Sequence, residues 1–229
     1  MAEAMTVETI IEADWQMHGY WTKVRVPLRT AKGSWSDIDV VAYHPERRHL
    51  VLCESKVRGP KKAVYAYTAH SKLKYGSILD FDLRDEGVHN YFSFLRHIRR
   101  ACRDKCIFEH FTRMVKRLTV QLVSNYYVAP EVMKDAEASV KKAIGKAVPT
   151  SVALDVRLDT TLDVIARIIA EENQKDQGRR YGHPVLDLAR ELNRYMHPDV
   201  HYAGRGKEAT TRVRRDLKAT FTGAIFPRE

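Results

Sequence analysis

Two acidic residues and a lysine lie at the ends of neighbouring apolar runs in the first quarter of the chain. Asp39 heads one run, and Glu54 and Lys56 close the next run, which begins at Leu50. A short turn containing Pro45 separates the runs, which is typical of the two strands of a β-hairpin. Because side chains alternate along a strand, Glu54 and Lys56 face the same side. Two carboxylates and a lysine at strand ends are the groups needed to hold a divalent metal and activate a water against a phosphodiester.

The predicted metal site has a third oxygen donor within the same motif. The backbone carbonyl of Ser55, together with Asp39 and Glu54, gives an oxygen-rich set that suits Mg²⁺ or Mn²⁺. Lys56 can orient the attacking water or neutralise charge that builds on the phosphate.

The elements before the hairpin have a simple order. Apolar residues recur with a helical period over residues 6–18, and Gly19 follows as a natural stop. Residues 21–28 alternate, which predicts a first strand with Lys23 and Arg25 on one face and Val24 and Val26 on the other. The predicted order is therefore one helix followed by three strands.

The rest of the chain mixes runs typical of strands with runs of helical period. This mixture predicts an α/β fold, with a central mixed sheet flanked by helices, a helical insertion at about 86–117 and a helical C-terminal tail. We divide the chain into an α/β domain, 1–175, and a basic helical extension, 176–229. After the hairpin, strands are predicted at 118–128 and 151–158, and helices at 61–75, 91–117, 130–147, 160–173, 184–196 and 207–219.

The charge balance of the chain points to a polyanionic partner. Its 229 residues contain 39 Lys and Arg against 29 Asp and Glu, a net charge of +10, which favours nucleic acid over a membrane surface. No apolar stretch approaches the ~20 residues of a spanning helix, and the N-terminus lacks the basic start of a signal peptide. Three cysteines without framework spacing fit a reducing compartment. We expect a cytoplasmic protein with no membrane partner.

Residues 6–60 resemble the PD-(D/E)xK nuclease superfamily, which has the restriction-endonuclease-like fold. The N-terminal pattern is similar to that of archaeal Holliday-junction resolvases, in which a helix glutamate precedes a glycine by eleven residues, as Glu8 precedes Gly19. The resemblance implies that the helix glutamate is Glu8, the motif aspartate Asp39, the second acid Glu54 and the lysine Lys56. It implies a Mg²⁺- or Mn²⁺-dependent DNA endonuclease with these four catalytic residues, in which Glu8 assists through a second metal or its water shell.

The chain departs from the superfamily pattern at positions that leave alternatives open. Ile38 stands where the superfamily's eponymous proline would be. Asp37 lies two residues before Asp39 and could replace it as a ligand, and Glu12, one helical turn from Glu8, competes for the helix role. A non-catalytic nucleic-acid-binding or scaffold protein of the same fold, and a nuclease acting on RNA, are the alternative functions. A symmetric substrate would call for a homodimer.

Basic residues flank the predicted site on both sides. We interpret six of them as phosphate contacts, with solvated surface charge as the alternative. A further basic cluster in the tail, residues 205–218, is open to the same two interpretations. The six are Arg25, Arg29, Lys32, Arg58, Lys61 and Lys62.

Overall fold

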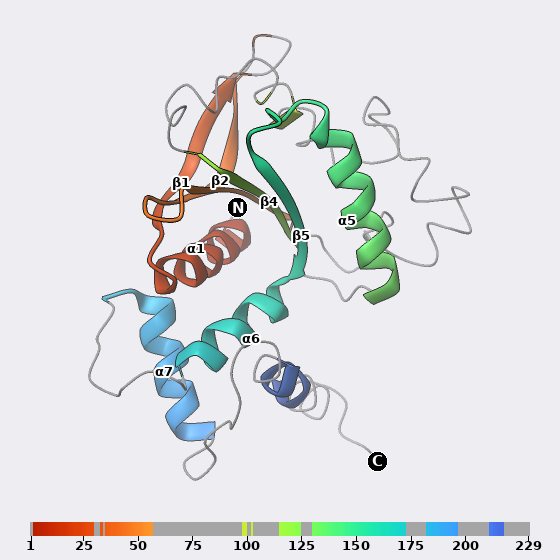
Figure 1. Ribbon diagram of the computed structural model, residues 1–229. Coiled ribbons are helices and arrows are strands. Elements are labelled where there is room, and N and C mark those ends of the chain that lie inside the picture. Colours follow the sequence, from red (N-terminus) through yellow and green to blue (C-terminus); the bar gives the residue numbers. More distant parts are fainter. Residues whose placement is uncertain are drawn as a thin grey trace.

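Figure 1 shows the computed structural model of the chain. The predicted helix at 61–75 and most of the predicted insertion at 86–117 lie outside the described residues, as does the predicted boundary between the two parts of the chain. The structure describes residues 2–29, 33, 35–56, 98–99, 102, 115–124, 130–172, 182–196 and 211–217.

A five-stranded mixed sheet forms the centre of the fold. Its first three strands form an antiparallel meander, and the last two strands run parallel to the third. The carboxyl ends of the last three strands therefore lie at one end of the sheet, and the predicted α/β class is confirmed. The strands, in spatial order, are β1 (Trp21–Arg29), β2 (Trp35–His44), β3 (His49–Lys56), β4 (Arg117–Ser124) and β5 (Ala153–Thr160).

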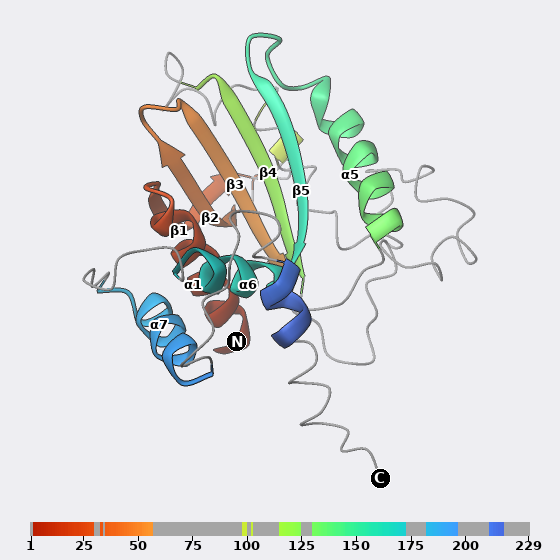
Figure 2. The same ribbon diagram turned by 60° about the horizontal axis from the view of Figure 1, so that its bottom comes forward.

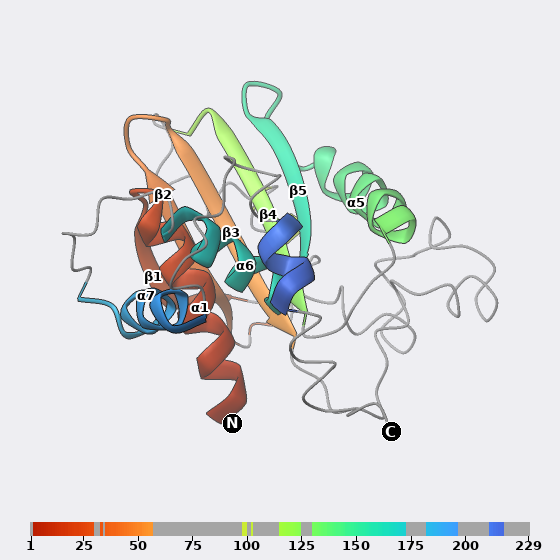
Figure 3. The ribbon, with the colours of Figure 1, turned by 90° about the horizontal axis from the view of Figure 1, so that it is seen from below.

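Helices cover both faces of the sheet (Figures 1 and 3). One face packs against α5 (Pro130–Gly145), and we call the apolar cluster between them the α5-side core. The other face is covered by α1 (Ala2–Met17) and α6 (Thr161–Glu172), and α7 (Pro184–Met196) packs on these two helices, which together form the α1-side core. A helical segment at 211–217 contributes Val213 and Leu217 to the α1-side core.

Local signals in the sequence fix the ends of α1 and α6. Gly19 follows α1 with φ +83°, a left-handed conformation that glycine adopts without strain, as predicted. Thr160 caps α6, because its Oγ1 accepts a hydrogen bond from the amide of Asp163 at 3.1 Å while Asp163 Oδ2 accepts one from the amide of Thr160 at 2.9 Å. This reciprocal pair is a capping box, in which the aspartate takes the place of the usual glutamate.

The predicted helix at 91–117 is wrong at its end. Arg117 is the first residue of β4 and pairs with His49 on one side and Ala153 on the other. A strand between two parallel neighbours gains backbone hydrogen bonds on both edges, and this pairing overrides the local helical pattern. The predicted strand at 118–128 is confirmed over 118–124.

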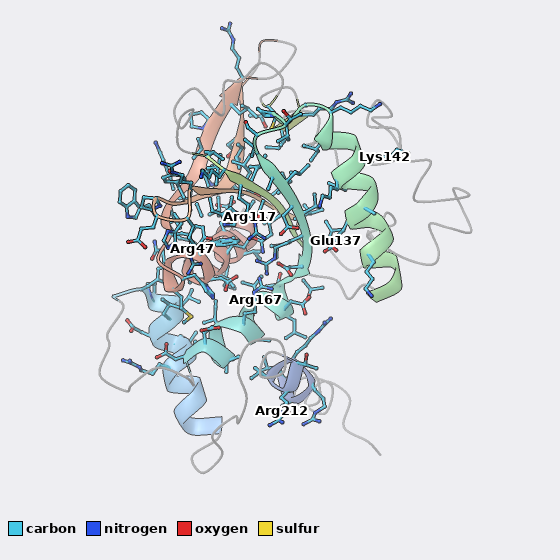
Figure 4. All side chains as sticks on the ribbon, viewed as in Figure 1. Arg47, Arg117, Glu137, Lys142, Arg167 and Arg212 are labelled. Carbon is cyan, nitrogen blue, oxygen red and sulfur yellow. The ribbon has the colours of Figure 1, made fainter. Side chains whose placement is uncertain are left out.

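A buried polar network fastens α1 to the sheet and to α6. Trp15 Nε1 of α1 donates to Gln121 Oε1 of β4 at 2.9 Å, and Gln121 Nε2 donates to Asp159 Oδ2 of β5 at 2.6 Å. Arg167 of α6 donates to Asp159 Oδ1 at 3.0 Å and to Asp14 Oδ2 of α1 at 2.9 Å. Since removing one partner of a buried ion pair leaves an uncompensated charge, this network sets the position of α1 strongly. Figure 4 labels Arg167 on α6.

A second buried polar group lies at the beginning of β3. His49 is 6% exposed, with its Nδ1 2.6 Å from Tyr20 Oη and its Nε2 2.8 Å from Thr119 Oγ1. Burial, and after it the positive charge of Arg117, lowers the pKa of the His49 imidazole from 6.5 to about 4. His49 is therefore neutral in the folded protein at neutral pH.

This shift predicts a stability that falls as the solution becomes acidic. Between pH 6.5 and about 4 the unfolded state binds a proton at His49 that the folded state does not bind. The stability associated with the neutral His49 is therefore fully present above pH 6.5. It is lost as the pH falls to 4, at a cost of up to about 3 kcal/mol. Denaturant unfolding of the wild-type chain and H49Q at pH 8 and pH 4.5 measures it. The loss on acidification should be smaller in H49Q, and equal losses would contradict the buried neutral state.

Candidate functional site

The carboxylate of Asp39 lies against the end of β3. The antiparallel pairing of β2 with β3 stops at Val40 and Cys53. Two residues after Cys53, the amide of Ser55 donates to Asp39 Oδ2 at 2.7 Å, and Ser55 Oγ donates to the same oxygen at 2.9 Å. Glu54, which precedes Ser55 on β3, is 7% exposed. Of the three residues predicted as metal ligands, the structure therefore brings Asp39 into contact with Ser55, and Glu54 is the neighbour of Ser55 along β3.

A break in the pairing of β1 with β2 lies at Asp39. The ladder pairs Val24 with Val40 and Val26 with Ile38, but the position between them, Arg25 opposite Asp39, is missing from it. Arg25 has φ +53°, a left-handed conformation that is uncommon for any residue other than glycine. Ile38 packs in the α5-side core and Val40 in the α1-side core. The strand therefore changes face at Asp39, and the usual alternation of side chains fails there.

The break turns Arg25 toward α1. Arg25 Nε donates to Glu8 Oε2 at 3.1 Å, and its Nη2 donates to Glu8 Oε1 at 3.2 Å, a two-pronged contact. The hydrogen bond to Glu8 and the negative charge of that carboxylate raise the pKa of the Arg25 guanidinium, and the charges of Asp37 and Asp39 act in the same direction. The predicted alternation of residues 21–28 is therefore wrong at Arg25, since the left-handed residue places its side chain on the α1 side.

Arg25 links the predicted helix glutamate to the strand acids. Glu8 is buried at 5% exposure, while half of the Arg25 side chain, 51%, is exposed to solvent. A carboxylate that is otherwise shielded is thus neutralised by a cation that solvent can reach. The guanidinium can exchange this partner for another anion that arrives from solution.

The acidic residues among which the sequence left a choice have different partners in the structure. Glu12 Oε1 accepts a hydrogen bond from Thr22 Oγ1 at 2.8 Å, one helical turn further along α1 than Glu8. Asp37 is exposed and lies opposite Pro27 of β1 in the strand pairing. The contacts to Arg25 and Ser55 are made by Glu8 and Asp39, which favours these two for the site.

The other predicted site residues are described in part or not at all. The backbone of Lys56 lies in β3 opposite Ser124, and its side chain lies outside the described residues. Arg29 is exposed at the end of β1. Four predicted phosphate contacts also lie outside the described residues: Lys32, Arg58, Lys61 and Lys62.

The oxygen donors at the site fit a hydrated divalent ion. Asp39 Oδ2 accepts both bonds from Ser55, whereas Oδ1 accepts none from the described residues. Mg²⁺ is typically bound through one or two carboxylates while it keeps several waters, so Asp39, Glu54 and the carbonyl of Ser55 are sufficient donors. Within the described ranges, no group of three or more His, Cys, Asp or Glu side chains is gathered closely enough to hold a metal ion.

Two contacts of this site were not predicted from the sequence. The charge pattern of the sequence predicts that Arg25 contacts phosphate. It gives no sign that Arg25 pairs with Glu8, which lies 17 positions away. Ser55 was expected to contribute its carbonyl, whereas its amide and hydroxyl are the groups that hold Asp39. A left-handed arginine within a strand carries no sequence signal, since arginine is not a residue that favours that conformation.

Comparison of the chain with protein-family models, with curated proteins and with solved structures finds no match. Among the helices that the structure describes, none is both long enough and apolar enough to cross a lipid bilayer.

The break at Arg25 predicts an inverted preference between glycine and alanine. In a regular strand, R25G would be less stable than R25A by about 0.5–1 kcal/mol because glycine loses more backbone entropy. At φ +53° alanine carries a steric penalty of about 1–2 kcal/mol that glycine lacks, which outweighs the entropy cost of glycine, so R25G should be the more stable variant. Both substitutions remove the contact to Glu8, so the comparison isolates the backbone. Urea unfolding of the pair measures the sign, and a more stable R25A would contradict the break.

Proposed function

We propose that this chain is a metal-dependent nuclease of restriction-endonuclease-like fold that hydrolyses phosphodiester bonds in DNA. The observation that carries the proposal is the contact between Asp39 and Ser55, which holds the first carboxylate beside Glu54 at the end of β3. A helix that precedes the first strand and an antiparallel β1–β2–β3 meander are compatible with the superfamily that residues 6–60 resemble. The net charge of +10 suits a polyanionic substrate.

In this proposal Asp39, Glu54 and the carbonyl of Ser55 hold Mg²⁺ or Mn²⁺. The bound ion would polarise the scissile phosphate and lower the pKa of a bound water. Ser55 keeps Asp39 in place through its amide and hydroxyl, so the carboxylate need not reorganise when the ion binds. Lys56, two residues after Glu54 on the same strand, orients the attacking water and offsets the charge that develops on the phosphate.

Glu8 and Arg25 form the second half of the proposed site. Without substrate their ion pair keeps the buried carboxylate of Glu8 neutralised. A phosphate that enters the site competes for the exposed guanidinium of Arg25, since arginine binds phosphate and carboxylate with the same two-pronged geometry. Glu8 then accepts hydrogen bonds from water at the site.

The proposal predicts that D39N and E54Q lose cleavage and keep the fold. Each change removes one negative charge but keeps the size of the side chain, and the side-chain amide introduced by D39N still offers an oxygen to Ser55. We expect cleavage to fall by about 100-fold or more, the scale of removing one important electrostatic contact, at a similar melting temperature. The assay uses labelled duplex, single-stranded, flap and junction DNA with Mg²⁺ or Mn²⁺, and a chelator as the blank.

D37N is the matched control for D39N, because Asp37 is an exposed aspartate on the same strand. It should retain most of the activity. Loss of cleavage in D37N but not in D39N would transfer the ligand role to Asp37. A wild-type chain that binds DNA without cutting it would favour the non-catalytic alternative, and cleavage confined to RNA would favour the RNA nuclease.

A second pair of variants separates the two helix glutamates. E8Q removes the charge that pairs with Arg25, whereas E12Q removes one that bonds to Thr22 at the beginning of β1. We expect E8Q to lower the cleavage rate by about 10-fold or more, the low end for a group that supports a metal site, and E12Q to change it little. Rates are compared with melting temperatures in the same buffer. If E12Q is the more damaging change, Glu8 has been assigned the wrong role.

A further inference from the structure

The helical segment at 211–217 packs onto the protein through Val213, Arg214 and Leu217. Val213 and Leu217 lie four residues apart, on one face of the helix, and are buried at 1% and 7% exposure in the α1-side core. Between them, Arg214 Nη1 lies 2.9 Å from Asp163 Oδ1 of α6. The segment is thus docked by apolar contacts and by an ion pair to Asp163, the partner of Thr160 in the capping box of α6.

This docking places the segment at the end of the sheet that carries the candidate site. Lys56 at the end of β3 pairs with Ser124, and Ser124 pairs with Thr160 at the end of β5, so the three residues lie at one level. Thr160 caps α6 together with Asp163, the partner of Arg214. Two strand spacings of ~4.8 Å separate β3 from β5, or roughly 10 Å. Figures 2 and 3 both show the segment beside these strand ends.

The outward face of the segment is cationic. Arg212 and Arg215 are exposed, and Figure 4 shows Arg212 pointing away from the sheet. Arg215 pairs with the neighbouring Asp216 at 3.2 Å, but the arginine is 75% exposed, and such a surface pair holds it weakly. The two apolar side chains of the segment are buried, so it lacks the exposed apolar face with which an amphipathic helix enters a membrane.

We propose that the segment 211–217 is a phosphate-binding arm, in which Arg212 and Arg215 contact the backbone of a nucleic acid strand beyond the scissile bond. The position of the arm relative to the reaction rests on the proposed function, because that function places the scissile phosphate at the end of β3. The arm contacts phosphates and reads no bases, so it adds affinity and register without sequence preference.

The test is the salt dependence of duplex DNA binding by the full chain, measured by fluorescence anisotropy in a chelator so that no cleavage occurs. Each phosphate contact adds about 0.9 to the slope of log K against log salt. R212Q/R215Q should therefore lower the slope by up to about 2 and weaken binding at low salt. K141Q/K142Q is the matched control, since both lysines are exposed on α5, on the opposite face of the sheet. It should leave the slope near that of the wild type.

L217N tests whether the arm must be docked. It keeps the net charge but removes a buried apolar contact of the segment, so binding should weaken although no cation is lost. Melting temperature shows that the rest of the protein stays folded. Unchanged binding in L217N would mean that the arginines act as a loose cationic tail, which overturns the docked arm.

Other outcomes also decide the proposal. Equal slopes in the wild type and R212Q/R215Q, or an equal fall in the α5 control, would overturn the arm and leave only general surface charge. Binding to anionic lipid vesicles that R212Q/R215Q abolishes, with an unchanged DNA slope, would assign the arginines to a lipid surface. Failure of the proposed function is visible separately, as a wild-type chain that does not cut DNA with Mg²⁺ or Mn²⁺, whatever the slopes.

Discussion

The break between β1 and β2 at Arg25 and Asp39 is the constraint on which the candidate site depends. A continuous ladder would place Asp39 on one face of the sheet and Arg25 beside it on the neighbouring strand. The left-handed backbone of Arg25 interrupts that ladder, and β2 changes face at Asp39. Asp39 is then held by Ser55 of β3, and Arg25 by Glu8 of α1. Strained backbone of this kind costs free energy and persists where surrounding contacts impose it.

The position of α1 supplies the second requirement, because Glu8 reaches Arg25 only if the helix is fixed against the sheet. Arg167 bridges Asp14 of α1 and Asp159 of β5, and Trp15 bonds to Gln121 at the centre of β4. These buried polar contacts lie along the same helix as Glu8, about one and a half to two turns away. Apolar packing alone allows a helix to slide or rotate, whereas directional bonds to buried charges specify one arrangement.

The sequence predicted the elements whose signals are local. The hairpin around Pro45, the stop at Gly19 and the helix predicted from residue 160 depend on neighbouring residues, and the structure confirms each of them. The break at Arg25 and the bridge from Arg167 to Asp14 could not be predicted. The first needs a conformation that arginine rarely adopts, and the second joins residues 153 positions apart whose charges have no sequence relation to each other. Local chemistry thus indicated which residues form the candidate site, and tertiary contacts determined how they are held.

The most direct test of the central claim is anomalous diffraction from crystals of the chain soaked in Mn²⁺. We predict a single strong peak at the end of β3, with carboxylate oxygens of Asp39 and Glu54 and the carbonyl of Ser55 at about 2.2 Å, a typical distance for a hard divalent cation. The peak should disappear in D39N crystals and persist in D37N crystals. A Mn²⁺ peak elsewhere, or one at the end of β3 that survives D39N, would contradict the account.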